Sequence, residues 1–450
     1  MKQTQLSLYT VIERKGLKFK KGFLLGTIFL CFTAGSFSQN LNLPDAINIA
    51  LKNSLDIQLQ RNNLEIAKIN NYVGVAGGLP QVAATASDNE QLINVNQKLN
   101  TGQEIKRSAA PANNLSANVT AGMLLYNGFR VMATRKRLEQ LELQNEKYLN
   151  SQVQNVIAQV MTAYYDVIRQ QAYVKTFDLS IDVAQKRLEI VKAQQSVGMA
   201  NNADLFQSQL DLNNLQQLKT SQMLVVDQAK TSLLTLLTLK PDSAISIVDT
   251  IIVDRTLVLG DILSSIHQNA DILAAIDQVR INELIVKETG AQRYPTVRAT
   301  AAYNFTRNQV AAGNVLLNRS YGPSGAIALG IPIFNGSIYK RQEKVAEINV
   351  QNAGLQRDIL IRDYTSNAVR TFQAYSTNLQ QLETGRKNLE LAQKLLNLVL
   401  LRYQYREATI LEVRQAQESF QNTAFALTNL TFAAKSSEIE LQRLINQIKF

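Results

Sequence analysis

The chain has 450 residues, of which 46% are hydrophobic, and its net charge is +11. Its mean hydropathy of −0.11 excludes an ordinary protein with many membrane-spanning helices, because such chains are apolar over long stretches. Basic and acidic residues are interspersed, which excludes the clustered basic patch of a nucleic-acid-binding protein.

Residues 1–38 have the features of a secretory signal peptide. A basic segment that ends at Lys21 precedes an apolar run over residues 23–34, and Ser36-Phe37-Ser38 offers small residues at the cleavage position. The run is shorter than the roughly 20 residues of a transmembrane helix, and a retained amphipathic anchor is the alternative. Cleavage would lower the net charge to +6 and remove Cys31, the only cysteine, so the mature chain would form no disulfide.

The next segments change from a helical to a strand period. Apolar residues recur at steps of three and four over residues 41–71, which predicts a helix. Leu115–Tyr126 alternates apolar with small polar residues, and this is the length and pattern of a transmembrane β-strand. Val82–Ser87 is a weaker strand, and residues 88–114 are predicted to form a polar loop between the two. A strand pair in a soluble sandwich is the alternative.

A turn is predicted at Tyr126-Asn127-Gly128, after which the helical period returns. Residues 130–197 contain neither Pro nor Gly and predict a helix roughly 100 Å long. A turn at Gly198–Asn202 leads to an antiparallel partner helix over residues 203–239. Residues 243–258 are then expected to be an irregular linker.

The second half repeats this order of elements. Its predicted elements are a helix over residues 259–287, strands over 297–306 and 327–333, the turn Phe334-Asn335-Gly336, a long helix over 339–405, and a last helix from Ile410 to the C-terminus.

The repeat has a constant offset. Ala184-Gln185-Lys186 recurs as Ala392-Gln393-Lys394, and Tyr126-Asn127-Gly128 recurs as Phe334-Asn335-Gly336, each 208 residues later. The chain is therefore interpreted as a tandem duplication. The two structural repeats are residues 39–256 and 257–450.

Four strands per chain are too few to close a barrel, and unpaired strand edges are not tolerated in lipid. The strands are therefore expected to come from several chains. Three chains would supply twelve strands, an even number wide enough for an open pore, although strand number alone permits other cyclic orders. The predicted fold class is mainly α with a transmembrane β-barrel, in which long antiparallel coiled-coil helices form a tunnel.

In order and spacing, these elements resemble the TolC family of outer-membrane factors, over essentially all of residues 41–450. The resemblance rests on the duplicated plan, on the Asn-Gly turns at both strand-to-helix junctions, and on the helix turns near Gly198 and Thr409. It implies a homotrimeric channel in a Gram-negative outer membrane, with its helical tunnel in the periplasm. It also implies a passive exit duct of a tripartite efflux pump or a type I secretion system, without a cofactor.

The resemblance further implies that the tunnel tip is closed, and that a periplasmic adaptor and an inner-membrane transporter of the RND, ABC or a similar class open it. Three features depart from the family pattern. Arg406 stands where a Gly is common, and Gln415 occupies a position that is often a second acid. The chain also stops soon after its last helix, without a C-terminal contribution to an equatorial belt.

Catalytic constellations are missing from the sequence. His267 is the only histidine, so it builds neither a catalytic triad nor a zinc site, and no Gly-rich phosphate loop or nucleophile elbow is present. We therefore expect that the protein is not an enzyme and that it holds neither a metal ion nor a cofactor.

Acidic residues follow both tip turns. Thr409-x-x-Glu412 predicts a capping box, and Asn201-x-x-Asp204 is its analogue, so that each acid can simply cap a helix. The alternative for Glu412 is a ring of carboxylates, one per chain, which narrows the pore and selects cations. The candidate tip residues are Gly198, Asn201, Asp204, Tyr403, Arg406, Thr409, Glu412 and Gln415.

Tyr403 and Arg406 could latch the second hairpin to the first, with Asp204 as a charged partner. Solvated surface residues are the alternative. The aromatic residues at strand ends predict a membrane-interface belt. They are Tyr126, Phe129, Tyr294, Tyr303, Tyr321 and Phe334. For Tyr126 and Phe334, packing at the junction between barrel and helices fits equally well.

A different class of function also fits the elements. The chain could be a secreted coiled-coil scaffold or adhesion protein without transport activity, whose β segments form a soluble cap. The exported substrate is not indicated by any motif.

Overall fold

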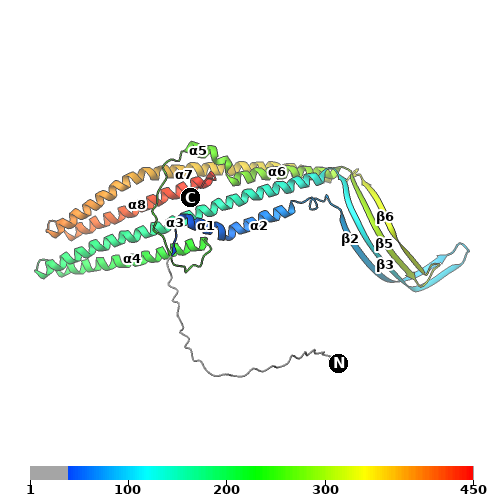
Figure 1. The fold of residues 1–450 in the computed structure, drawn as a ribbon, viewed down its shortest axis with the longest axis horizontal. Coiled ribbons are helices and arrows are strands. Elements are labelled where there is room, and N and C mark those ends of the chain that lie inside the picture. The colour runs from blue at the N-terminus through cyan, green and yellow to red at the C-terminus, as the bar shows by residue number, and fades with distance from the viewer. Residues whose placement is uncertain (1–38, 449–450) are drawn as a thin grey trace, which may run out of the picture. The chain divides into compact units, whose positions relative to one another are not determined.

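Two long helical hairpins and one four-stranded sheet make up the computed structural model, which describes residues 39–448 (Figure 1). The sheet extends from one end of the hairpins, and the helix-to-helix turns lie at the other end. The predicted signal peptide lies outside the described residues. Within residues 39–448, no helix is both long enough and apolar enough to cross a membrane.

The two long helices agree with their predicted bounds to within one residue, whereas their shorter partner helices end before the predicted residue 239 and before the C-terminus. The first hairpin consists of α3 (Arg130–Ser196) and α4 (Asn202–Leu236), and the second of α7 (Ile338–Gln404) and α8 (Ile410–Leu444). The long helix has 67 residues and its partner 35 residues in each hairpin. A helix of that length spans about 100 Å. All four pairs of helix bounds are 208 residues apart.

Unusual backbone conformations follow the same offset. Four pairs of residues with a positive φ are 208 residues apart, although three of these pairs differ in residue type. The backbone path is thus more alike in the two halves than the sequence is. The pairs are Gly128 and Gly336, Phe129 and Ser337, Gly198 and Arg406, and Thr238 and Asn446.

The single helix predicted over residues 41–71 is wrong, because the structure contains α1 (Leu43–Asn53) and α2 (Leu55–Asn70). Ser54 separates them. Its side chain accepts a hydrogen bond from the Ile57 N–H at 3.4 Å and so starts a new helix. Hydrophobic periodicity continues across such a cap, which is why the break is not visible in the pattern.

The helix predicted over residues 259–287 is interrupted in the same way. The structure has α5 (Leu259–Ser265), the 3₁₀ turn η1 (Ile266–Gln268) and α6 (Ala270–Gly290). Asn269 caps α6, since its side chain accepts a hydrogen bond from the Asp271 N–H at 2.9 Å. A second 3₁₀ turn, η2 (Ala291–Arg293), follows α6.

The sheet is antiparallel, with the strand order β2-β3-β5-β6. Its strands are β2 (Gln81–Lys98), β3 (Glu104–Asn127), β5 (Thr296–Val310) and β6 (Leu317–Gly330). Within the described residues, β2 and β6 each pair along one edge only. The outer edges of both strands therefore carry unpaired backbone groups.

Two strand predictions are corrected by the structure. Residues 88–114 are not a loop: β2 and β3 continue through them, and only residues 99–103 connect the two strands. The last strand ends at Gly330, so Ile331 and Ile333 lie beyond it. Outside the alternating region both faces of the strands are polar, so hydrophobic periodicity does not reveal these parts of the strands. Backbone hydrogen bonds to the neighbouring strand hold them in the sheet.

The strand register places apolar side chains on one face of the sheet and polar side chains on the other. Large residues of the apolar face remain exposed, including Ile327 with 75% of its surface accessible. The apolar face is lined by Val82, Ala84, Ala86, Leu115, Ala117, Val119, Ala121, Met123, Val297, Ala299, Ala301, Tyr303, Phe305, Tyr321, Ile327 and Leu329. The polar face carries cross-strand hydrogen bonds, such as that from Thr85 Oγ1 to Asn118 Oδ1 at 2.9 Å.

The largest core lies at the middle of α3, where α1, the end of α4 and the segment between the repeats pack together. Tyr164 and Val160 of α3 are fully buried there beside Leu233. The predicted irregular linker, residues 243–258, contains the short strand β4 (Ile245–Ser246). It pairs in parallel with β1 (Gln39–Asn40).

The two strand-to-helix junctions have the same backbone conformation but different surroundings. Gly128 and Gly336 have φ values of 65° and 66°, which L-residues rarely adopt. A Cβ at Gly128 would lie 2.7 Å from the Ala291 carbonyl oxygen and 2.7 Å from the Tyr294 Cβ. A Cβ at Gly336 would meet no atom within 4 Å. The first junction therefore requires glycine for two reasons and the second for one.

Gly336→Ala is expected to lower the free energy of unfolding by about 1–2 kcal/mol, the cost of a left-handed L-residue. Gly128→Ala should lower it further, because its methyl group also overlaps neighbouring atoms. Thermal unfolding of the two purified variants checks this order. Equal losses would show that residues 291–294 shift without cost.

Candidate functional site

Both hairpins end in the same tip turn. In the first, Gly198 has a φ of 76°, its N–H donates to the Gln195 carbonyl at 2.8 Å, and the Met199 N–H donates to Gln194 at 2.7 Å. These two bonds form the Schellman motif that ends many helices. Asn201 then caps α4 by accepting a bond from the Asp204 N–H at 2.7 Å.

The second tip has the same bonds with an arginine in place of the glycine. Arg406 has a φ of 65°, its N–H donates to Tyr403 at 3.1 Å, and the Glu407 N–H donates to Arg402 at 2.8 Å. A left-handed conformation costs an L-residue about 1–2 kcal/mol. The second tip thus forms the same turn as the first, although arginine replaces glycine.

The Arg406 side chain joins the two tips. Its Nη2 donates a hydrogen bond to the Met199 carbonyl oxygen of the first tip at 3.0 Å. The predicted link between the hairpins is therefore present, but its acceptor is a backbone carbonyl rather than Asp204. Asp204 is half-buried at the start of α4.

Tyr403 is buried rather than a surface residue. It belongs to a core that spans both hairpins, together with Val191, Leu396, Val413 and Phe420. Burial raises the pKa of Tyr403, the Asp204 carboxylate raises it further, and the Arg187 guanidinium lowers it. Tyr403 is thus close enough to Asp204 and Arg187 to be influenced by both charges.

The predicted capping box at the second tip is confirmed. The Glu412 N–H donates to Thr409 Oγ1 at 3.2 Å, and the Thr409 N–H donates to Glu412 Oε2 at 2.6 Å. Glu412 and Gln415 are both exposed. The Glu412 carboxylate therefore caps α8 and at the same time faces solvent, so the two readings of this residue are compatible.

A buried ion cluster joins the two hairpins close to their tips, and the sequence pattern did not predict it. Arg187 of α3 is only 1% exposed, and its Nη2 donates to Asp211 Oδ2 of α4 at 2.7 Å. Arg414 of α8 approaches the same oxygen with its Nε at 3.4 Å. Gln207 Nε2 donates to Asp211 Oδ1 at 2.7 Å. A single carboxylate thus holds two guanidinium groups from different hairpins.

Periodicity missed this cluster because it places residue 187 on the packed stripe beside Leu188, where apolar residues are expected. Burial lowers the pKa of Arg187, Asp211 raises it, and Arg414 lowers it. Arg187 still carries its charge, since an arginine side chain is not deprotonated in proteins. The available sequence signal was an acid and a base at similar distances on either side of the tip turn.

Asp211→Asn is expected to lower the free energy of unfolding by about 3 kcal/mol, because it leaves the buried Arg187 guanidinium without a countercharge. Asp182→Asn, which removes an exposed i,i+4 pair with Lys186, is the matched control and should cost less than about 1 kcal/mol. Chemical denaturation of both variants measures the difference. Equal effects would mean that Arg187 does not depend on Asp211.

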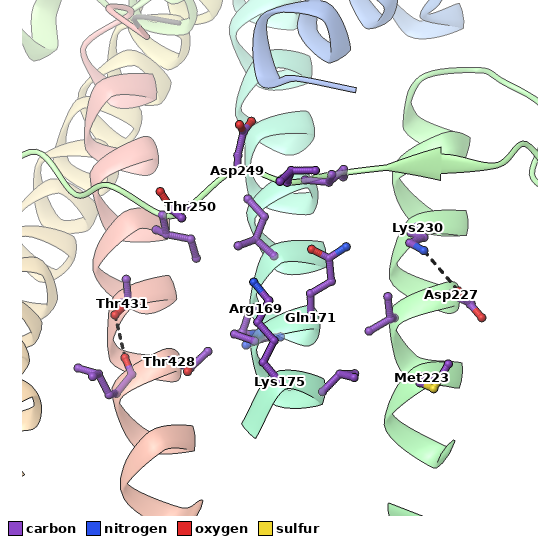
Figure 2. Close-up of a pocket in the computed structure, with 18 residues that line it drawn as sticks. Arg169, Gln171, Lys175, Met223, Asp227, Lys230, Asp249, Thr250, Thr428 and Thr431 are labelled. Carbon is purple, nitrogen blue, oxygen red and sulfur yellow. Dashed lines mark hydrogen bonds and ion pairs between the residues drawn. The ribbon is translucent and has the colours of Figure 1, made fainter. Parts of the chain in front are cut away.

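A groove of about 670 Å³ lies where the inter-repeat segment crosses the helices (Figure 2). Asp249 and Thr250 lie on that segment, Arg169 and Lys175 on α3, and Thr428 on α8. Its 18 lining residues include neither His nor Cys.

The inter-repeat segment is held to both hairpins by buried polar contacts. The Tyr164 hydroxyl of α3 donates to Asp249, and the Tyr375 hydroxyl of α7 donates to the Asp254 carbonyl. The Asp254 N–H donates to Glu438 Oε2 of α8 at 2.9 Å. Burial is the main cause that raises the pKa of Tyr375 to about 12. These contacts fix the segment across the middle of the helices.

Glu438 is the buried acid in this network. Its Oε1 lies 2.7 Å from Lys435 Nζ, and the Glu438 side chain is 3% exposed. Burial raises the pKa of Glu438, although Lys435 and the Asp254 N–H lower it. The folded state therefore binds this proton more tightly than the unfolded chain does.

The stability that Glu438 confers should fall with pH. Between the ordinary glutamate pKa and the raised folded value, the folded state holds more protons, so its free energy of unfolding decreases as pH rises. Glu438→Gln mimics the protonated form and should gain stability relative to the natural protein between pH 4 and pH 8. Unfolding curves of both proteins at both pH values measure this difference in the free energy of unfolding. If the natural protein instead gains stability relative to Glu438→Gln as pH rises, pairing with Lys435 outweighs burial.

The remaining predicted residues have varied positions. His267 is exposed on η1, and no group of three or more His, Cys, Asp or Glu side chains in residues 39–448 is placed to hold a metal ion. Tyr303 and Tyr321 are exposed on the apolar face. Tyr126 packs edge-on against Phe129, with 5.4 Å between ring centroids, whereas Phe334 is exposed and has no such packing among residues 39–448.

The junction asparagines differ as well. Asn127 Oδ1 accepts a hydrogen bond from the Val131 N–H at 3.4 Å and so supports the first turn of α3. The Asn335 side-chain nitrogen is buried without a partner in the described part of the chain. The two Asn-Gly junctions therefore have the same backbone conformation, but their asparagine side chains form different hydrogen bonds.

The fold is that of outer-membrane channels of known structure. The outer membrane protein VceC of Vibrio cholerae matches with a TM-score of 0.72 and 20% identity, over 90% of this chain and 96% of that chain. The CmeC outer membrane channel of Campylobacter jejuni matches with 0.76 and 15%, over 90% and 85%. The open state of the MtrE outer membrane channel of Neisseria gonorrhoeae matches with 0.66 and 16%, over 90% and 89%.

The chain belongs to the outer membrane efflux protein family, whose model matches residues 46–239 and 262–447. The two matched segments end 208 residues apart, in agreement with the offset of the helices. A search of curated protein sequences finds no match.

Proposed function

We propose that this outer membrane efflux protein is the passive exit duct of a tripartite efflux pump, with type I secretion as the alternative use of the same duct. The observation that carries the proposal is the exposed apolar face of a four-stranded sheet attached to helices about 100 Å long. Water disfavours an apolar surface of this extent, whereas lipid accommodates it. The helices are long enough to lead from such a membrane segment through the periplasm.

The proposed assembly is a homotrimer. Within residues 39–448, β2 and β6 have one free edge each, and unpaired strand edges are not tolerated in lipid. Pairing β6 of one copy with β2 of the next closes a ring, and three copies give a barrel of twelve strands. The polar face, with Asn118 and Asn304 among its residues, would then line the pore.

Duplication explains the internal symmetry of each copy. The helix bounds, the positive-φ residues and the ends of the two family matches all follow the 208-residue offset. We place the two repeats at residues 39–256 and 257–450. A trimer of duplicated chains would present six hairpin tips at the end of the tunnel.

The tips form the proposed gate and the contact site for a periplasmic adaptor, which in turn engages an inner-membrane transporter of the RND, ABC or a similar class. Three kinds of contact join the two hairpins of one chain at this point: the Arg406–Met199 hydrogen bond, the core around Tyr403, and the cluster at Asp211. Opening would have to separate or rotate these contacts. Glu412, exposed at the start of α8, is proposed to line the narrowest point.

The experiment that tests the duct is membrane fractionation followed by planar-bilayer recording. The protein should sediment with outer membranes as a trimer and give a small conductance that prefers cations. A soluble pool without conductance would instead favour a secreted coiled-coil scaffold or adhesion protein.

Two variants of Glu412 separate its charge from its capping role. Glu412→Ala removes both, whereas Glu412→Gln keeps a capping acceptor and removes the charge. If the carboxylate lines the pore, both variants should lose cation preference and conduct more. If only Glu412→Ala changes the current, Glu412 acts as a cap and has no place in the gate.

A further inference from the structure

Two arginines stand directly opposite each other on the apolar face of the sheet. Arg307 of β5 pairs in register with Arg319 of β6, one step beyond the pair Phe305 and Tyr321. Side chains in such a pair lie about 5 Å apart at Cβ, and like charges in this position repel each other. A negative group between them would remove this repulsion.

The described residues supply no such group. Neither arginine forms an ion pair within residues 39–448. Arg307 Nη2 donates to Gln309 Oε1 at 2.6 Å, and its Nε is buried without a partner. The nearest acids on this face, Asp88 and Glu90, lie on β2 and both accept hydrogen bonds from Asn113, at 2.6 and 2.7 Å.

The position of the pair indicates what the ligand is. Between the arginine pair and the helix end of the sheet, the apolar face runs from Val297 to Phe305. These nine residues span about 30 Å of strand, which suits the apolar band of a tilted membrane strand. Tyr303 and Tyr321 are exposed at the end of this band, as interfacial aromatic residues are. Arg307 lies near the end of β5 and Arg319 near the start of β6, so both lie toward the end of the sheet that points away from the helices (Figure 1). In a sheet that spans a membrane, this is the level of lipid head groups.

We propose that Arg307 and Arg319 bind the phosphate group of a lipid in the outer leaflet, while its acyl chains cover the apolar face below. Guanidinium groups bind phosphate through two parallel hydrogen bonds, and one phosphate can neutralise both charges. The site rests on the proposed function, since it requires this face of the sheet to contact lipid.

The test measures lipid binding to the full chain, purified from outer membranes, by native mass spectrometry. The probes are bis-phosphorylated lipid A, the same lipid after removal of its phosphates, and inorganic phosphate. Arg307→Gln with Arg319→Gln should weaken binding of the phosphorylated lipid about 30-fold, from about 1 kcal/mol per arginine. Arg298→Gln, on the same strand but on the polar face, is the matched control and should bind as the natural protein does.

Several outcomes would overturn the proposal. These are equal binding of the dephosphorylated lipid, unchanged binding by the double variant, or an equal loss in Arg298→Gln. Inorganic phosphate that displaces the lipid at the same concentration would identify a free-anion site instead. If the double arginine variant and Asp88→Asn with Glu90→Gln both abolish the trimer, the arginines pair with acids of a neighbouring copy of this chain, and the lipid site is wrong.

Fractionation separates this proposal from the proposed function. A protein that is absent from outer membranes contradicts the duct itself. A protein that is present there and conducts, but does not retain the phosphorylated lipid, contradicts only the arginine site.

Discussion

Backbone hydrogen bonds join β2, β3, β5 and β6 into one sheet, but the outer edges of β2 and β6 have no partner within residues 39–448. In water such edges invite uncontrolled pairing, and in lipid they are prohibitively costly. The sheet also exposes one apolar face. Both features agree with the proposed assembly, in which the sheet lies in a membrane and pairs with other copies of the chain.

At the other end of the hairpins, the balance of forces is different. The tips are joined by a small apolar core, one arginine–carbonyl hydrogen bond and a carboxylate shared by two guanidinium groups. Ions that are largely removed from water hold a specific geometry, yet they add little net stability compared with apolar packing. Such a joint specifies the position of the hairpins and can still rearrange, which suits the proposed gate.

The two halves of the chain have similar backbone conformations, but the contacts at equivalent positions differ. Gly198 and Arg406 occupy equivalent left-handed positions, but only Arg406 has a side chain that reaches the other tip. Gly128 is enclosed by residues 291–294, whereas Gly336 has open space around it. Equivalent positions in one chain thus have different tolerances to substitution, because the two positions of a pair meet different neighbours.

The sequence by itself determined the elements with strong local signals: the two 67-residue helices, their tip turns, the capping box at Thr409 and the alternating part of β3. Helical period, missing Pro and Gly, and cap residues are local and therefore readable. Only the tertiary structure decided that β2 and β3 continue through residues 88–114, since partner strands rather than side-chain alternation hold them there. It also decided that Arg187 is buried, because its countercharge comes from a different helix and is visible only once α3, α4 and α8 are packed together.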